Sequence, residues 1–455
     1  SNTRSLTILG GTVDGNGAAP SLTTRTLTLD AGGELTNGSG TTETINIRQR
    51  SSLTLAGEIT GNLNMNFGAE NGSRTTRVTG NNSYTGTTVI SDVIGGSNRT
   101  NTVIVDQDVL VNQDGPLGNS DTAIILGSSG GNAIASALLT DGDIEIARDI
   151  TFANNTNTGD RARTLGAAST QVGDSEFSGT ITIAGTSGAR SLNVTAPDGA
   201  TVSFTGDIVG GTAAGTVTKT DDGTVIFAGN NTYAGSTIVS AGTLLVNGSL
   251  SGSSPVTVNS GATLGGSGRV GVVSGDGMVA PGNSPGILTA DSIDPSGGLD
   301  FSFQLNQSIP DWANSFASGN DVLRLDGSAP LDSAMTAANT FDIYFDDAGT
   351  FVGGIFTDLD ADFTALVEDA TFNYFLQDGA GAISYEGETY SALDPLDVQF
   401  DIIQIASADF ASGTVNDGWA MQFVAIPEPS TSVMGLLGLH SLAAFRRRKQ
   451  RAASY

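Results

Sequence analysis

The chain has 455 residues, of which 62 are Gly and none is Cys, and its formal charge is −28 although only 15% of its residues are charged. A low charged fraction with a mean hydropathy near zero excludes an acidic disordered tail, and the negative charge excludes a nucleic-acid-binding protein. Without disulfides the fold needs a long hydrophobic core, and many glycines beside only 12 prolines favour tight turns between short strands.

The charge is distributed unevenly along the chain. Residues 1–270 contain 22 acidic and 13 basic residues, whereas residues 271–445 contain 25 acidic residues and one basic residue, Arg324. The other five bases lie between 446 and 451, so the C-terminal tail is a separate electrostatic unit. No signal peptide is recognisable from Ser1, and because the chain begins without Met, we expect a targeting segment to precede it.

Short segments that alternate apolar and polar residues begin near the start of the chain. The segments 27–29, 45–47, 63–67, 103–105 and 181–183 each predict a strand with one buried face. Gly, Asn, Asp and Ser separate them, and up to about residue 330 no helical period is sustained for more than a turn. We therefore predict an all-β region.

One segment of the sequence is repeated. VTGNNSYTGTTVI at 78–90 returns as FAGNNTYAGSTIV at 227–239. The recurring turn residues are Gly80, Asn81, Asn82, Tyr84 and Gly86 in the first copy and Gly229, Asn230, Asn231, Tyr233 and Gly235 in the second. This repetition predicts stacked coils that form a parallel β-helix, in which each coil contacts its neighbours.

Each residue of the repeat has an expected role. We expect the Gly-Asn-Asn turn to use positive φ, and the second glycine to bend the chain into the next strand. The tyrosine ring should cover the edge of the core while its hydroxyl meets water. Asn and Thr at equivalent positions of successive coils should form hydrogen-bonded ladders.

The segment 218–250, TKTDDGTVIFAGNNTYAGSTIVSAGTLLVNGSL, resembles the autotransporter-associated β-strand repeat of bacterial passenger domains and related surface proteins. GATLGGSGRVGVVSGDGMVAPGNSPGILTA at 261–290 resembles the run that follows this repeat, and GPLGNSDTAIILG at 115–127 resembles another phrase of the family. The resemblance is clearest at 77–130 and 218–290. It implies a right-handed parallel β-helix over 1–290, outside a Gram-negative-type cell, and it implies no reaction.

The composition changes at about Asp291, where Phe, Asp and Ala become more frequent and glycine turns become rarer. Segments such as LDFSFQLN, FNYFLQ and LDVQFDIIQIA predict longer, more aromatic strands. We predict that 291–424 is an acidic, β-rich cap or sandwich that closes the solenoid, because an open end invites edge-to-edge association. Both a separate domain and terminal coils of the solenoid fit this composition.

Three acidic residues form a candidate metal site. Asp358, Asp360 and Asp362 alternate, so on a strand their carboxylates would share one face, as calcium ligands require. Read as an EF-hand loop, the segment has Phe363 where glycine is needed, and an acidic, solvated strand face explains the same pattern. Apart from this calcium candidate, we expect no metal and no cofactor.

A polysaccharide-degrading lyase or glycosidase is the alternative function, because parallel β-helices often carry such enzymes. The sequence gives it little support. Lys219 is the only lysine before the tail, and the only histidine, His440, lies in the tail, so a Ser-His-Asp triad is not expected. A groove with three or more carboxylates and an arginine would favour the enzyme, whereas evenly spread polar faces favour a structural protein. We predict that the chain is not an enzyme.

The tail has three parts. Pro427-Glu428-Pro429 cannot continue a strand or helix easily, so an extended, accessible segment is expected. Residues 430–445 carry no formal charge, and as a helix they would span about 24 Å, less than a hydrocarbon core of ~30 Å. Arg446, Arg447 and Arg448 would remain on the cytoplasmic side. The pattern predicts a short C-terminal hydrophobic helix that inserts transiently into the membrane.

The order of these parts over 426–451 resembles the PEP-CTERM sorting signal. The resemblance implies recognition by exosortase, a membrane-bound, cysteine-dependent transpeptidase-like enzyme, and removal of the tail during export. The Pro-Glu-Pro motif would be recognised and Arg446–Arg448 would stop transfer. We therefore predict an exported structural or adhesive protein, held in the membrane before processing. At the cell surface or in the extracellular matrix it would contact polysaccharide or other cells.

Overall fold

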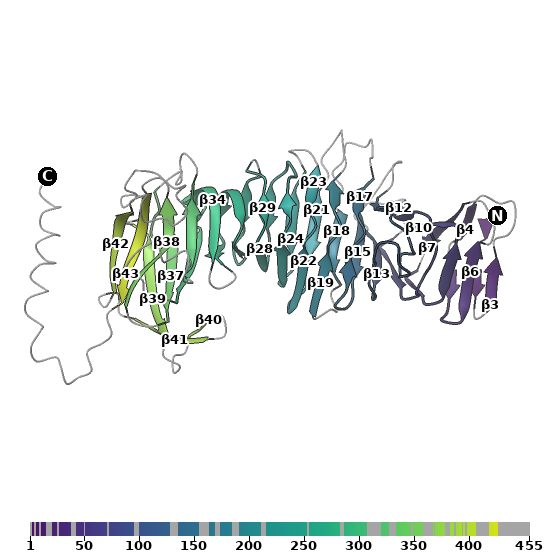
Figure 1. The fold of residues 1–455 in the computed structure, drawn as a ribbon, viewed down its shortest axis with the longest axis horizontal. Coiled ribbons are helices and arrows are strands. Elements are labelled where there is room, and N and C mark those ends of the chain that lie inside the picture. The colour runs from purple at the N-terminus through teal and green to yellow at the C-terminus, as the bar shows by residue number, and fades with distance from the viewer. Residues whose placement is uncertain are drawn as a thin grey trace, which may run out of the picture.

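The protein is an elongated β-rod, with β1 (Asn2–Thr3) near one end and β42 (Val398–Ile405) at the other (Figure 1). The structure is a computed structural model. It describes residues 2–3, 6–8, 11–14, 21–24, 27–37, 42–49, 51–70, 72–94, 100–127, 135–153, 163–168, 173–183, 191–210, 215–252, 254–282, 286–306, 320–326, 334–346, 349–357, 367, 369–377, 383–385, 388–393, 395, 398–405 and 418–425.

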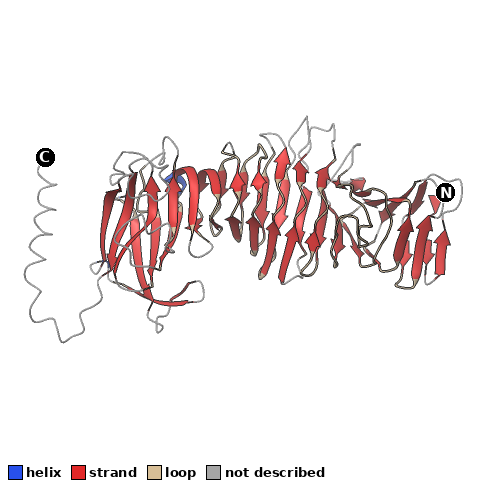
Figure 2. Cartoon of the chain, in the orientation of Figure 1, coloured by secondary structure: helices blue, strands red, loops and turns tan. Residues whose placement is uncertain are grey.

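Up to residue 61 and again from 145 to 227, successive strands lie in turn on three faces of the rod, whereas between 63 and 140 they alternate between two of these faces. Equivalent strands of successive coils pair in parallel (Figures 1 and 2). Sheet 1, on the first face, consists of β1, β4 (Ser21–Thr24), β7 (Glu43–Gln49), β10 (Leu63–Glu70), β12 (Thr88–Ile94), β14 (Ile124–Leu126), β17 (Ile150–Phe152), β20 (Ile181–Ile183) and β23 (Ile208–Gly210). Sheet 3, on the third face, consists of β3 (Gly11–Asp14), β6 (Gly33–Asn37) and β9 (Glu58–Gly61).

The two other sheets extend to the C-terminal end of the rod. Sheet 2 contains β2 (Leu6–Ile8), β5 (Leu27–Leu29), β8 (Leu53–Leu55), β11 (Arg74–Val78), β13 (Thr100–Val105), β15 (Ala135–Thr140), β18 (Arg163–Ala167), β21 (Leu192–Thr195), β24 (Val217–Thr220), β26 (Asn230–Asn231), β27 (Thr237–Val239), β29 (Ser249–Leu250), β30 (Val256–Val258), β32 (Arg269–Gly275), β34 (Ile287–Asp294), β36 (Val322–Leu325), β38 (Gly349–Thr357), β42 and β43 (Gly418–Ala425). Sheet 4 contains β16 (Glu145–Ile146), β19 (Gly173–Phe177), β22 (Ala200–Phe204), β25 (Thr224–Phe227), β28 (Thr243–Val246), β31 (Thr263–Gly266), β33 (Met278–Pro281), β35 (Asp300–Leu305), β37 (Thr340–Phe345), β39 (Thr371–Gln377), β40 (Ile383–Tyr385) and β41 (Glu388–Ala392).

The core follows from the period of two in each strand. Burial alternates strictly along β22 and β25, and the register places Val202 beside Val225 inside the rod. Burying each such side chain contributes about 1.5–3 kcal/mol, but a single coil has no partner for its inner face, so the coils must stack. The predicted polar ladders are present on the outside, where Asn66 Nδ2 donates to Asn46 Oδ1 at 3.0 Å.

Part of the acidic charge joins one coil to the next. The carboxylate of Asp207 accepts the backbone N–H of Asn230 at 2.8 Å, and Asp149 accepts that of Thr180 at the same distance. Asp108 accepts the N–H of Glu145 at 2.9 Å in the same way. Charge-assisted bonds of this kind are stronger than neutral ones, so these aspartates stabilise the turns between strands.

The parallel arrangement changes near the C-terminal end. The division expected at residue 290 falls inside β34, and parallel pairing continues through β35, β37 and β39. Antiparallel strands then follow in both sheets, β43 beside β38 and β41 beside β39. The predicted all-β fold and parallel solenoid are confirmed, whereas the predicted helix at 430–445 lies outside the described residues.

Candidate functional site

Residues 80–88 and 229–237, which we call the first and second corner motifs, bind back to the preceding coil through a buried asparagine. In the first corner motif, Asn82 Oδ1 accepts the backbone N–H of Ile59 at 2.8 Å. In the second, Asn231 Oδ1 accepts the N–H of Ile208 at 2.9 Å. The following residue completes the contact, because Ser83 N–H and Thr232 N–H donate to the carbonyls of Ile59 and Ile208 at 3.0 and 2.9 Å.

The position of these contacts explains what the repeat does in the fold. Ile59 lies on β9, the last strand of sheet 3, and Ile208 lies on β23, the last strand of sheet 1. Each corner motif therefore occupies the place where the next strand of that sheet would lie, and in the second motif Asn230 and Asn231 form the short strand β26, which pairs with β29. The asparagine oxygen satisfies a backbone donor that would otherwise be buried without a partner, a situation that costs about 1–3 kcal/mol.

The tyrosine of each motif is completely buried, so the prediction that its hydroxyl meets water was wrong. Tyr84 and Tyr233 are 0% and 1% exposed. Tyr84 Oη lies 2.9 Å from Thr88 Oγ1, and Tyr233 Oη lies 2.5 Å from Thr237 Oγ1. Burial raises the pKa of both tyrosines to about 12. The hydroxyl is covered because later residues of the chain close over it.

Those later residues differ between the two motifs. In the first, Thr88 Oγ1 donates to the carbonyl of Leu117 at 3.0 Å, and Asn82 Nδ2 donates to that of Pro116 at 2.6 Å. In the second, Ser254 Oγ lies 3.4 Å from Thr237 Oγ1. The GPLGNS phrase at 115–120 thus serves to complete the first corner motif.

The prediction of positive φ in the Gly-Asn-Asn turn was wrong for both copies. The glycines are required by the close approach of the preceding coil. A Cβ atom at Gly80 would lie 2.1 Å from the carbonyl oxygen of Gly57, and one at Gly229 would lie 2.5 Å from that of Gly206. At Gly235 the corresponding distance, to the carbonyl oxygen of Gly215, is 1.3 Å. Asn81 and Asn230, also predicted as turn residues, are exposed.

Two buried cations support the turns around the corner motifs. Arg148 is 0% exposed and donates to the carbonyls of Leu117 and Thr122 at 2.6 to 3.1 Å. Lys219 is also 0% exposed, and its ammonium donates to the carbonyls of Thr220, Asp221 and Ala241 at 2.5 to 3.1 Å. Burial lowers the pKa of Lys219 to about 8.

Arg148 was not recognised from the sequence, although a signal was present. Ile146, Arg148 and Ile150 are all buried while the residues between them are not, so the period of two places the arginine inside the rod. A charged residue at an inward position predicts a set of backbone acceptors around it, because a buried charge must be paired or hydrogen-bonded.

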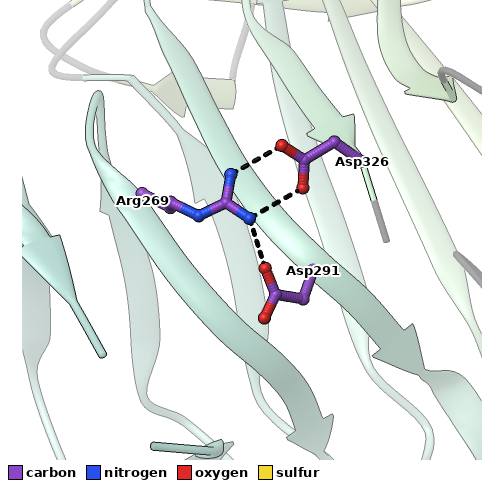
Figure 3. Close-up of polar contacts among 3 residues, drawn as sticks. All are labelled: Arg269, Asp291 and Asp326. Carbon is purple, nitrogen blue, oxygen red and sulfur yellow. Dashed lines mark hydrogen bonds and ion pairs between the residues drawn. The ribbon is translucent and has the colours of Figure 1, made fainter. Parts of the chain in front are cut away.

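A cluster of charges on the surface joins three successive coils (Figure 3). Arg269 on β32 binds Asp291 on β34 at 2.5 Å and Asp326, just after β36, at 2.6 and 3.0 Å. These carboxylates raise the pKa of the arginine. Both carboxylates bind the guanidinium, so the cluster links the three coils through ion pairs.

Several predicted site residues lie outside the described residues: Asp358, Asp360, Asp362, Pro427, Glu428, Pro429, His440, Arg446, Arg447 and Arg448. Their predicted roles in calcium binding and sorting stay predictions. Within the described ranges, no group of three or more His, Cys, Asp or Glu side chains could hold a metal ion. In those same ranges, no helix is long and apolar enough to cross a bilayer.

Comparison with known protein families agrees with this geometry. Residues 71–92 and 217–246 match the passenger-associated-transport-repeat family, and these ranges contain all of the first and all of the second corner motif. Residues 425–450 match the PEP-CTERM protein-sorting motif. The chain therefore carries autotransporter-type passenger repeats and a sorting motif, as the sequence predicted.

Two characterised proteins are similar over shorter segments. The adhesin BmaC autotransporter of Brucella suis biovar 1 (strain 1330) is 38% identical over 109 residues, which cover 23% of this chain and 3% of the adhesin. An extracellular serine protease of Serratia marcescens is 43% identical over 88 residues, covering 19% of this chain and 8% of the protease. The chain therefore covers only a small part of the length of either relative. The repeats and the sorting motif indicate an exported, cell-surface or extracellular protein, and the adhesin similarity fits a non-enzymatic role.

Proposed function

We propose that the protein is a structural or adhesive rod, displayed at the cell surface or in the extracellular matrix of a Gram-negative-type bacterium after exosortase has removed its tail. The observation that carries the proposal is the junction at residue 425. The last strand in the described part of the chain, β43, ends at Ala425, and the sorting motif begins at the same residue. Processing after this point would therefore leave every described strand in the mature protein.

The proposed roles of the tail follow its three parts. Exosortase recognises Pro427-Glu428-Pro429, residues 430–445 hold the protein transiently in the membrane, and Arg446–Arg448 stop transfer. The tail carries all five bases of the C-terminal region, next to a segment of 25 acids and one base. Removal of the tail would therefore make the mature protein still more acidic.

The proposed mechanism of the mature protein is presentation of a long rigid surface. Each coil is fixed to its neighbours by parallel strands and corner contacts, so polar side chains repeat along the rod at a regular spacing. Repeated weak contacts with polysaccharide or another cell would then together give a higher avidity than a single contact. The described ion clusters pair their carboxylates with arginine, which supports a structural role over a polysaccharide-degrading enzyme.

The test is the intact mass of protein recovered from cells, combined with fractionation. We expect the exported form to end near residue 429, and the variant with Pro427→Ala and Pro429→Ala to keep its tail and remain with the membrane. Pro255→Ala, at an exposed proline between β29 and β30, is the control and should be processed normally. Recovery of Tyr455 in the exported wild-type protein would contradict the proposal.

A further inference from the structure

Four threonines lie in register on the outer surface of sheet 4. The register pairs Thr201 with Thr224, Thr224 with Thr243, and Thr243 with Thr263, on β22, β25, β28 and β31. All four are partly exposed, while the next residue in each strand is buried. We call this row the threonine ladder. Because neighbouring strands are about 4.8 Å apart, the ladder is about 14 Å long.

The hydroxyls of the threonine ladder make no hydrogen bond to another group in the described part of the protein. Some other outward polar residues do form such bonds. Thr60 Oγ1, for example, donates to Thr36 Oγ1 at 2.7 Å. The ladder therefore presents a line of hydroxyl donors and acceptors at the coil spacing, all of which are available to a ligand.

An aliphatic row runs beside the threonine ladder. Ile226 and Leu245 lie two residues further along β25 and β28, in register with each other, and both are partly exposed. Leu245 leans over Gly265 of the next strand, where its side chain would lie 3.0 Å from a Cβ atom. The face thus combines hydroxyl groups with a hydrocarbon strip, which matches the O–H edges and C–H faces of a sugar ring.

Charge restricts which polymer this face can accept. The outward residues of β22, β25, β28 and β31 are uncharged. Acids lie beyond both ends of the row: Asp174 on β19 beside Thr201, and Asp300 on β35, two strands beyond Thr263. These acids would repel a polyanion, and no basic side chain on these four strands faces outward to attract one. A second copy packed on the same face would bring acids against acids in either direction.

We propose that the threonine ladder binds a neutral, extended β-linked glycan lying along the rod. The coil spacing of about 4.8 Å is close to the length of one sugar in such a chain, so successive hydroxyls meet successive sugars. This proposal rests on the proposed display function and names a ligand class for it. A face this small gives weak binding at each site, and many displayed copies would supply avidity.

The experiment is titration calorimetry of the full chain with cellohexaose as the neutral probe and hexagalacturonate as its anionic counterpart. We expect wild type to bind cellohexaose and not hexagalacturonate. Thr224→Val with Thr243→Val removes two hydroxyls without changing shape, and binding should weaken about tenfold, since each neutral hydrogen bond is worth a few-fold. The matched control is Thr218→Val with Thr257→Val, which makes the same change on sheet 2 and should leave binding unchanged.

Three results would overturn the proposal. The first is absence of cellohexaose binding by wild type or a preference for hexagalacturonate. The second is an equal effect of the ladder and control variants. The third is self-association that the ladder variant abolishes and cellohexaose does not affect, which would assign the face to a second copy. Normal tail processing measured alongside any of these would leave the display function standing.

Discussion

The two corner motifs make the same contacts with the preceding coil but different contacts with later residues of the chain. In both, the asparagine accepts an isoleucine N–H of the preceding coil, and the tyrosine hydroxyl meets the threonine four residues later. Among later residues, the backbone carbonyls of Pro116 and Leu117 cover the first motif, whereas Ser254 covers the second. The residues shared by the two copies therefore attach each motif to the preceding coil, whereas the later residues that cover the motif can differ.

The two motifs also lie on different faces of the rod. The first follows β11 of sheet 2 and ends sheet 3, whereas the second follows β25 of sheet 4 and ends sheet 1. The motif binds the backbone N–H and carbonyl of one isoleucine on the preceding coil. Because every face offers such groups, the motif is not restricted to a particular face. Each motif lies at a point where one sheet of the solenoid ends.

The largest difference between the motifs is expected at the second glycine. Gly235→Ala should destabilise the protein by about 3 kcal/mol or more, because its Cβ would lie 1.3 Å from a backbone carbonyl that cannot rotate away. Gly86→Ala, where the distance is 2.2 Å, should cost about 2 kcal/mol. Urea unfolding measures both. Gly252→Ala, at an exposed site whose nearest contact is a side-chain oxygen of Asp291 at 3.1 Å, should change stability by less than about 0.5 kcal/mol.

The asparagines should show a difference in the opposite direction. Asn82→Ala breaks bonds to Ile59 N–H and to Pro116 O, two separate segments, and should cost about 3 kcal/mol. Asn231→Ala breaks one bond to the preceding coil and one within its own turn, and should cost about 2 kcal/mol. Asn81→Ala, at an exposed site, is the control for thermal unfolding. Equal losses at all three positions would refute the role given to the buried amide.

Much of this fold can be predicted from the sequence, since its signals are local. The period of two fixes which residues face inward, and repetition at 78–90 and 227–239 indicates stacking. The roles of Gly80, Tyr84 and Arg148 depend on which residues of other coils lie beside them. The register between coils cannot be read from the sequence. Gly80, which is needed for the close approach of another coil, was therefore interpreted as a turn glycine, and the buried hydroxyl of Tyr84 was interpreted as exposed to solvent.

The motifs should also differ in their response to alkaline pH. Lys219 precedes the second motif, and Glu70 occupies the equivalent position before the first. The native lysine loses its proton near pH 8, whereas the unfolded chain keeps it until about pH 10.4. Between these values the unfolded state binds more protons, so the free energy of unfolding should rise with pH, by at most about 1.4 kcal/mol per unit. Denaturant titrations at several pH values should show this slope in wild type, and Lys219→Met should lack it.

The smallest effect concerns Arg77, three residues before the first motif, which forms an ion pair with Asp141 and whose equivalent before the second motif is Ile226. Arg77→Ile installs the residue found before the second motif and should cost about 0.5–1 kcal/mol at low salt and almost nothing in 1 M NaCl. A double-mutant cycle with Asp141→Asn isolates the pair. A coupling energy that does not change with salt would show that the pair acts through packing.

The most direct test of the account is amide hydrogen exchange at Ile59 and Ile208, the two donors that the corner asparagines accept. The account predicts that Asn82→Ala accelerates exchange at Ile59 and leaves Ile208 unchanged, while Asn231→Ala does the reverse. Unchanged protection of both amides in both variants would contradict the claim that the asparagine of each repeat attaches it to the last strand of a sheet.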